Sequence, residues 1–314
     1  MRAAIAQVAP VFLDRVATLS KAADAVQTAA DQGAKLVCFG ETFIPAYPLW
    51  LSRTDGARFD ADDQKELHAL YMNEAVSVES NDLAPLVDAA TQHDTWIVVG
   101  IAERPADRSA HSLFASCVTI NPGGDIVSVH RKLVPTYEER LAWAQGDAHG
   151  LTAHDLGPFT LGSLNCWENW MPLTRAALYA QGVNLHVAIW PGNVSNTQDI
   201  TRFIARESRS YVLSASTIIR ASDIPSSVPH RDRIVTSEDE ILHNGGSAAA
   251  NPDGTWLLEP QAGTENVFVL DLDPAFVRRE RQNFDPTGHY ARPELIRLQV
   301  DRRRVTSADF LDAP

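Results

Sequence analysis

The chain is organised around one segment, which reads Gly162-Ser163-Leu164-Asn165-Cys166-Trp167-Glu168-Asn169-Trp170-Met171-Pro172-Leu173. The pattern predicts a strand that ends at Asn165, a turn at Cys166 and a helix that begins near Pro172, because proline is tolerated in the first turn of a helix. A thiol between a strand end and a helix N-terminus lies near backbone amides whose dipoles favour the thiolate. The segment therefore predicts a reactive cysteine, although a free cysteine taken alone is more often a small buried hydrophobic residue.

Size and composition are those of a globular protein with a substantial core. The chain has 314 residues, 45% of them hydrophobic, and no run approaches the roughly 18 apolar residues of a transmembrane helix. Its three cysteines, Cys38, Cys117 and Cys166, are too few and too scattered for a disulfide framework, which favours a reducing cytosol. The N-terminus reaches Gln7 and Pro10 too soon for a signal peptide. We therefore expect a soluble, cytoplasmic protein.

The charge balance limits the partners. A formal net charge of −13 argues against a nucleic acid or an anionic membrane, because both attract positive surfaces. One basic cluster near the C-terminus is typical of a solvated face or a subunit contact, and it consists of Arg278, Arg279, Arg281 and 302–304.

The same order of elements occurs twice along the chain. Each half contains buried strands, amphipathic helices and a hairpin that turns at an Asn-Pro pair. The first half has predicted strands at 3–8, 36–39, 96–100, 114–120 and 126–130, and predicted helices at 14–33, 63–74 and 83–92. After the strand that ends at Asn165, the second half has predicted strands at 184–190, 211–218, 247–250 and 255–258, and predicted helices from Pro172 and at 200–209.

This repetition predicts an α/β fold in which two sheets pack face to face with helices outside each, a four-layer α-β-β-α sandwich of two similar halves. No segment near residue 150 is rich enough in Gly, Ser or Pro to act as a linker, so both halves belong to a single domain, residues 1–272. Residues 273–314 show little periodicity, and we expect them to form a C-terminal tail that takes part in subunit contacts.

Three titratable residues lie at or just beyond predicted strand ends, where ligands of such sheets bind. Glu41 follows the strand at 36–39, Lys132 follows the strand at 126–130, and Cys166 follows the central strand. A thiol is mostly protonated at neutral pH, so a nucleophilic cysteine needs a base such as Glu41. Attack on a nitrile or amide carbon develops negative charge that a fixed cation such as Lys132 stabilises. Taken singly, Glu41 is also consistent with a cap or ion pair, and Lys132 with a solvated strand end.

Four stretches of the chain form a more specific pattern, namely 40–48, 130–140, 165–173 and 283–293. In this order they resemble the nitrilase superfamily, and the triplet Cys166-Trp167-Glu168 is similar to its nitrile-hydrolysing branch rather than to amidases and carbamoylases. The resemblance implies the four-layer sandwich, a Glu-Lys-Cys triad, no metal or organic cofactor, and self-association into a homodimer or a larger homo-oligomer.

The resemblance also implies roles for single residues. Glu41 corresponds to the general base, Lys132 to the cation that stabilises the tetrahedral intermediate, and Cys166 to the nucleophile. A second catalytic glutamate corresponds to Glu139, seven residues after Lys132, which leaves Glu138 as its solvated neighbour. Three residues are candidates for substrate binding, namely Tyr47, Trp167 through its backbone N–H, and Trp190 as a pocket wall. An indole such as that of Trp167 is more often plain core, and for Trp190 a role in packing alone is about as common.

The resulting prediction is a nitrilase that hydrolyses a small-molecule nitrile to the carboxylic acid and ammonia. An amidase or carbamoylase of the same superfamily is the nearest alternative, and a catalytically silent assembly protein is a further one. A metal hydrolase fits less well, because none of the ten histidines forms a His-Glu-x-x-His motif.

Overall fold

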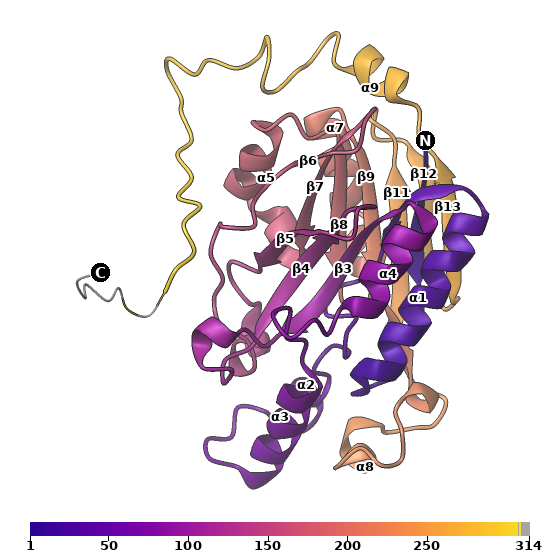
Figure 1. Cartoon of the computed structure of the whole chain (residues 1–314), viewed down its shortest axis with the longest axis vertical. Coiled ribbons are helices and arrows are strands. Elements are labelled where there is room, and N and C mark those ends of the chain that lie inside the picture. The colour runs from indigo at the N-terminus through magenta and orange to yellow at the C-terminus, as the bar shows by residue number, and fades with distance from the viewer. Residues whose placement is uncertain (307, 309–314) are drawn as a thin grey trace.

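Two facing sheets form the centre of the fold. Within residues 1–306 and 308, which the computed structural model describes, one sheet has six strands and the other seven (Figure 1). The order in the first sheet is β13 (Asn266–Asp271), β1 (Arg2–Gln7), β2 (Ala34–Cys38), β3 (Trp96–Glu103), β4 (Phe114–Ile120) and β5 (Ile126–Arg131). The order in the second is β10 (Ile218–Arg220), β11 (Ile241–Ala250), β9 (Tyr211–Ser216), β8 (Leu185–Trp190), β7 (Thr160–Asn165) and β6 (His154–Asp155), with β12 (Trp256–Ala262) also paired to β11.

The two sheets repeat one pattern, which confirms the prediction of two similar halves. In the first sheet β1, β2 and β3 are parallel, and β4 and β5 follow as an antiparallel hairpin. In the second sheet β7, β8 and β9 are parallel, and β11 and β12 form the matching hairpin. Each hairpin closes at its Asn-Pro turn, where the Asn121 and Asn251 amides donate to the carbonyls of Asp125 and Thr255.

Helices cover the outer faces of both sheets. Helices α1 and α4 pack on the first sheet, and α5 and α7 pack on the second, which gives the predicted α-β-β-α layers. The first long helix begins where Asp14 accepts a hydrogen bond from the Ala17 amide, as an N-cap residue does. The helices are α1 (Arg15–Asp31), α2 (Trp50–Arg53), α3 (Asp62–Glu74), α4 (Ala84–His93), α5 (Pro172–Tyr179), α6 (Val194–Thr197), α7 (Ile200–Ser208), α8 (Arg231–Ile234) and α9 (Pro274–Glu280).

The core is divided between the layers by the alternation of side chains along each strand. On β1, Ala4 and Ala6 contact the helix layer, whereas Ala3 and Ile5 pack against the other sheet, as the period of two requires. Cys38 and Cys117 belong to this sheet-to-sheet core and are free thiols. They therefore act as small buried hydrophobic residues.

The C-terminal part contains two elements that the sequence did not reveal. Strand β13 completes the first sheet by pairing antiparallel with β1. Helix α9 follows at once, and the Asp273 side chain caps it by accepting a hydrogen bond from the Ala275 amide. The segment that begins at residue 273 therefore starts with a helix. Residues 307 and 309–314 of the predicted tail lie outside the described residues. The domain boundary at 272 and the role of the tail in subunit contacts stay predictions.

Membrane insertion through a helix has no support in the described part of the chain. No helix there is both long enough and apolar enough to cross a bilayer.

Candidate active site

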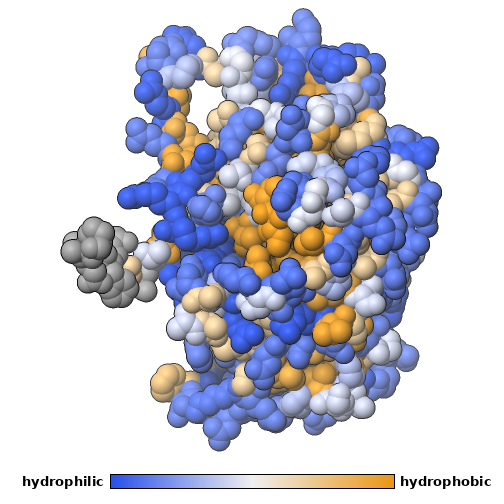
Figure 2. All heavy atoms as spheres, viewed as in Figure 1, coloured by the Kyte–Doolittle hydropathy of each residue, from blue (hydrophilic) through white to orange (hydrophobic). Residues whose placement is uncertain are grey.

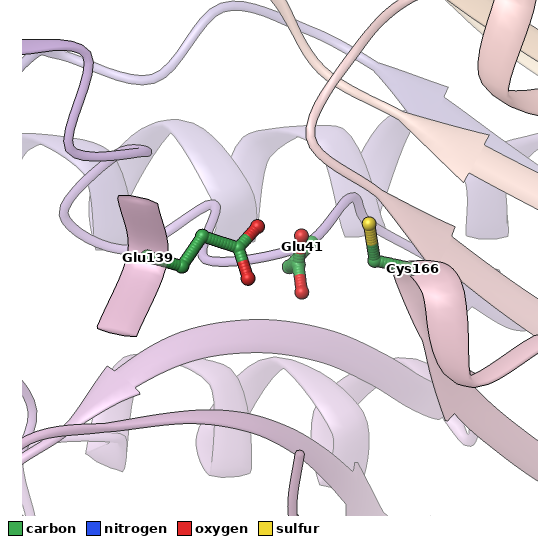
Figure 3. Close-up of side chains that lie close together, drawn as sticks. All are labelled: Glu41, Glu139 and Cys166. Carbon is green, nitrogen blue, oxygen red and sulfur yellow. The ribbon is translucent and has the colours of Figure 1, made fainter. Parts of the chain in front are cut away.

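The three titratable residues predicted at strand ends lie together. Glu41 and Cys166 lie close to each other (Figure 3), and Lys132 forms an ion pair with Glu41. Strand β5 runs antiparallel to β4, which runs antiparallel to β3, so the carboxyl end of β5 lies at the same edge as those of β2 and β3. The Lys132 ammonium donates to Glu41 Oε1 at 2.8 Å. The turn that carries Glu41 is tied to the second sheet, because its amide donates to the Trp190 carbonyl at 3.0 Å.

Glu139 is the fourth member of this cluster. One side-chain atom each of Glu41, Glu139 and Cys166 lies within 4.8 Å of the others, and Lys132 Nζ lies 2.6 Å from Glu139 Oε2. The same oxygen accepts the Thr136 amide at 2.6 Å, in the capping box of the 3₁₀ turn Tyr137–Leu141. The side chain of Glu139 is 3% exposed and, through its contact with Lys132, belongs to the site. The neighbouring Glu138 is not part of this cluster.

Cys166 occupies a strained turn immediately after β7. Its φ is +47°, a left-handed conformation that costs a residue with a Cβ on the order of 1–3 kcal/mol. The Asn169 amide group holds this turn by donating to the Cys166 carbonyl at 2.9 Å, and Asn169 Oδ1 lies 2.7 Å from Nε2 of the buried His186. The surrounding structure therefore fixes the direction in which the thiol points.

Burial and the lysine act in opposite directions on Glu41. Desolvation raises the pKa of its carboxyl, the Lys132 ammonium lowers it, and the net pKa is about 7. Burial also acts to lower the pKa of Lys132, but the negative charge that Cys166, Glu41 and Glu139 can carry outweighs this, so the net pKa is raised. Lys132 therefore stays charged, and Glu41 can take up or release a proton near neutral pH.

The thiol of Cys166 is protonated at rest, which corrects one prediction from the sequence. Burial and the Glu41 carboxylate raise its pKa well above the usual value, and the opposing effects of Lys132 and the Trp167 amide are smaller. The expected preference for thiolate at this position is wrong because desolvation exceeds the effect of the nearby amides. A neighbouring base is needed to remove the proton.

The three residues predicted to bind substrate lie in different surroundings. Tyr47 contacts the site directly, since its hydroxyl donates to Glu139 Oε1 at 3.0 Å. Trp190 is completely buried in the cluster that contains Cys166. Trp167, however, is 51% exposed, so the alternative that its indole packs in the core is wrong. Its backbone amide hydrogen-bonds to the sulfur.

Sequence reasoning gave no individual role to three side chains around the cluster. Trp143 packs its ring 5.8 Å from Lys132 Nζ and edge-on to Tyr47. Asn169 holds the cysteine turn, and Glu168 caps it by accepting the Asn165 amide at 2.9 Å. The spacing of Asn165 and Glu168 is that of a capping box, a signal that was available in the sequence.

A metal ion is the one cofactor that the donor set suggests, because Glu41, Glu139 and Cys166 together offer two carboxylates and a thiolate. Lys132 Nζ, however, bridges Glu41 and Glu139 at 2.8 and 2.6 Å. A fixed ammonium thus supplies the positive charge that a metal would bring, and the site as folded does not fit an additional cation.

Comparison with known proteins agrees with this arrangement. Residues 2–282 match the family described as carbon-nitrogen hydrolase. The chain is 32% identical over 317 residues to Nitrilase 2 of Arabidopsis thaliana, covering 99% of this chain and 91% of that protein. It is 33% identical over 306 residues to an aliphatic nitrilase of Sinorhizobium fredii (strain HH103), covering 96% of this chain and 95% of that one.

Solved structures show the same fold at lower identity. Nit3 of Saccharomyces cerevisiae, a member of branch 10 of the nitrilase superfamily, superposes with a TM-score of 0.69 at 18% identity, covering 92% of this chain and 96% of that chain. An amidase from Nesterenkonia sp. superposes with a TM-score of 0.62 at 18% identity, covering 90% of this chain and 94% of that chain. At this identity the likeness concerns the fold alone.

Proposed function

The chain belongs to the carbon-nitrogen hydrolase family, and from this premise we propose that it hydrolyses an organic nitrile to a carboxylic acid and ammonia through a covalent intermediate on Cys166. The observation that carries the proposal is the buried Lys132 ammonium, which bridges Glu41 and Glu139 beside the thiol of Cys166. The relatives at 30% identity or more whose names describe nitrilases support a nitrile rather than an amide as substrate.

The first half of the reaction forms the carbon–sulfur bond. Glu41 takes the thiol proton, Cys166 attacks the nitrile carbon, and the nitrile nitrogen receives the proton, which gives a thioimidate. Glu41 has an oxygen suited to this step, because Oε1 binds Lys132 whereas Oε2 is buried without a hydrogen-bond partner among the described residues. The Lys132 ammonium and the Trp167 amide stabilise the negative charge that develops.

The second half releases the products with two molecules of water. Glu41 activates the first water, which adds to the thioimidate carbon, and loss of ammonia leaves a thioester. A second water then frees the carboxylic acid and restores the thiol. Glu139 holds Lys132 in place throughout. If the tetrahedral intermediate expels sulfur instead of ammonia, an amide is released, so some amide by-product is expected.

The choice between a nitrilase and an amidase is tested by substrate preference. Ammonia release is measured from a panel of aliphatic, arylaceto- and aromatic nitriles and from the amides of the same acids. We expect the best nitrile to give the higher kcat/KM. Faster turnover of the matching amides across the panel would make the amidase alternative correct.

The rate should depend on pH through Glu41. Since only the ionised carboxylate can accept the thiol proton, kcat/KM for an uncharged nitrile is expected to fall about tenfold per pH unit below a limb near the Glu41 pKa of about 7. Glu138→Gln serves as the matched control, because this neighbouring carboxylate is outside the cluster, and it should leave the limb in place. A profile that is flat from pH 5 to 8 would contradict the assignment of Glu41 as base.

We further propose that the chain forms a homo-oligomer through its C-terminal arm, residues 282–306. The arm leaves the body after α9, and Figures 1 and 2 show open space between it and the rest of the molecule. It returns where the Arg304 guanidinium binds Asp147 Oδ1 at 3.0 Å. Between these points Ile296 and Leu298 are 84% and 38% exposed, more apolar surface than an arm in water favours.

The arm is tested by changing its apolar side chains to charged ones. The double variant Ile296→Asp, Leu298→Asp is expected to weaken self-association by at least about tenfold, because each buried aliphatic side chain contributes roughly 1.5–3 kcal/mol. Sedimentation velocity over a concentration series measures the effect. Asp88→Lys, an exposed position on α4 outside the arm, is the control and should keep the parental assembly. Unchanged assembly of the double variant would show that the arm is not the contact.

A further inference from the structure

Glu168 is a buried carboxylate whose contacts join the two sheets. It is 1% exposed and lies in the 3₁₀ turn Cys166–Trp170. Its Oε1 accepts the Leu133 amide at 2.7 Å, and its Oε2 accepts the Asn165 amide at 2.9 Å. The ring nitrogen Nε2 of His130 lies 3.2 and 3.1 Å from the two oxygens. Each carboxylate oxygen therefore accepts one backbone amide, Oε1 from the first sheet's segment and Oε2 from the second's, and both oxygens lie beside the His130 ring.

The residues that contact Glu168 lie close in sequence to Lys132 and to Cys166. Lys132 lies between His130 and Leu133 on the segment that leaves β5, in the first sheet. Cys166 lies between Asn165 and Glu168 on the segment that leaves β7, in the second sheet. A further bond crosses the same gap, since Asn165 Nδ2 donates to the His130 carbonyl at 3.4 Å. The lysine and the cysteine are otherwise held by different sheets.

We propose that Glu168 is a positioning residue that fixes the Lys132 ammonium relative to the Cys166 sulfur. It binds neither side chain itself. It acts through backbone amides next to each of them, and so ties the segment that carries Lys132 to the segment that carries Cys166. The inference deepens the proposed function, since the geometry it explains is that of the proposed nucleophile and its cation.

The ionisation of Glu168 supports this role. Burial acts to raise the pKa of its carboxyl, but His130 and the Leu133 and Asn165 amides lower it more, so the net pKa is lowered. A carboxylate with these donors accepts hydrogen bonds with both oxygens. A glutamine would place its NH₂ group against a backbone N–H, two donors facing each other, and one of the two segments would be released.

The test compares Glu168→Gln with the parent. We expect kcat to fall about 100-fold, since a shift of about 1 Å in a reacting group has this effect, while KM changes by less than about threefold. A merely structural role would not move the pH profile. Because Lys132 lowers the pKa of Glu41, release of the lysine should move the acidic limb of kcat/KM to higher pH.

A second readout does not depend on any nitrile. The rate at which iodoacetamide alkylates Cys166 is followed against pH by mass spectrometry. Lys132 lowers the pKa of this thiol, so its release in Glu168→Gln should shift the alkylation midpoint to higher pH. If the parent hydrolyses no nitrile but this shift occurs, the proposed function fails and the positioning role stands.

Two further variants complete the test. His130→Phe keeps an aromatic ring but removes one donor, so it should give a smaller shift in the same direction, and it decides the matter if Glu168→Gln does not fold. Asp82→Asn is the matched control, because Asp82 also accepts a backbone amide, that of Ser77 at 2.8 Å, and binds Arg15 at 2.9 Å, but contacts neither segment. It should lower the melting temperature and leave both pH midpoints unchanged. Parental midpoints in both Glu168→Gln and His130→Phe would overturn the proposal.

Discussion

Replacing Cys166 with alanine is expected to abolish ammonia release from every nitrile that the parent consumes. The sulfur forms the bond on which each later step depends, so a loss of more than about 10⁴-fold in kcat is expected, as for other covalent nucleophiles. The fold should survive, because the change removes one buried atom beside Trp190. Ammonia release with circular dichroism on the same sample measures both quantities.

The control for this variant is Cys117→Ala. Cys117 is also a completely buried free thiol, but it lies in the core between the sheets. Its removal should cost some stability through the cavity and leave ammonia release at the parental rate. Substantial activity in Cys166→Ala, or loss of activity in Cys117→Ala without unfolding, would contradict the role of Cys166.

Replacing Lys132 with methionine should have the largest effect on stability. The side chain is fully buried and is the shared partner of Glu41 and Glu139. Without it two carboxylates remain close together in the interior, and breaking a buried ion pair in this way costs about 3–5 kcal/mol. Urea unfolding measures the loss. Activity should also disappear, because no cation remains for the tetrahedral intermediate.

The stability deficit of this variant should depend on pH. The pKa of the Glu41 carboxyl is raised in the folded protein to about 7. Protonation of Glu41 therefore adds to the free energy of unfolding at low pH, and this stabilisation is lost as the pH rises through about 7. Without the lowering effect of Lys132 the pKa rises further, and protonation then neutralises Glu41. The deficit should therefore be largest above about pH 7 and smaller at pH 5.

Lys35→Met is the control for the lysine, because Lys35 forms an exposed pair with Asp94 at 2.6 Å. Exposed pairs contribute about 0–1 kcal/mol, so this variant should unfold at nearly the parental urea concentration. A Lys132→Met protein as stable as Lys35→Met would show that the ammonium does not hold the two carboxylates in the fold.

The sequence predicted the fold and the cluster because both follow from local signals. Buried strands are recognisable in the sequence as apolar runs, and the residues just beyond parallel strands lie at one edge of the sheet. Glu41, Lys132 and Cys166 could therefore be placed together from the chain alone. The choice of Glu139 over Glu138 came from the resemblance to the nitrilase superfamily, and the structure places Glu139 against Lys132.

Other features depend on tertiary packing and were not accessible. The pKa of Cys166 is raised by burial among distant residues, which spacing along the chain does not report. The Trp167 side chain is largely exposed, whereas its aromatic character alone favoured packing in the core. Strand β13 was missed because it completes a sheet whose partner β1 is about 260 residues away.

The central claim is that Cys166 becomes covalently attached to the substrate carbon. The most direct measurement is the intact mass of the protein, quenched in acid during turnover of its best nitrile, followed by peptide mapping. The account predicts an added mass equal to the thioimidate or the acyl group on the peptide that contains Cys166, and no such adduct in Cys166→Ala. Steady turnover with an unmodified Cys166, or with the adduct on another residue, would contradict it.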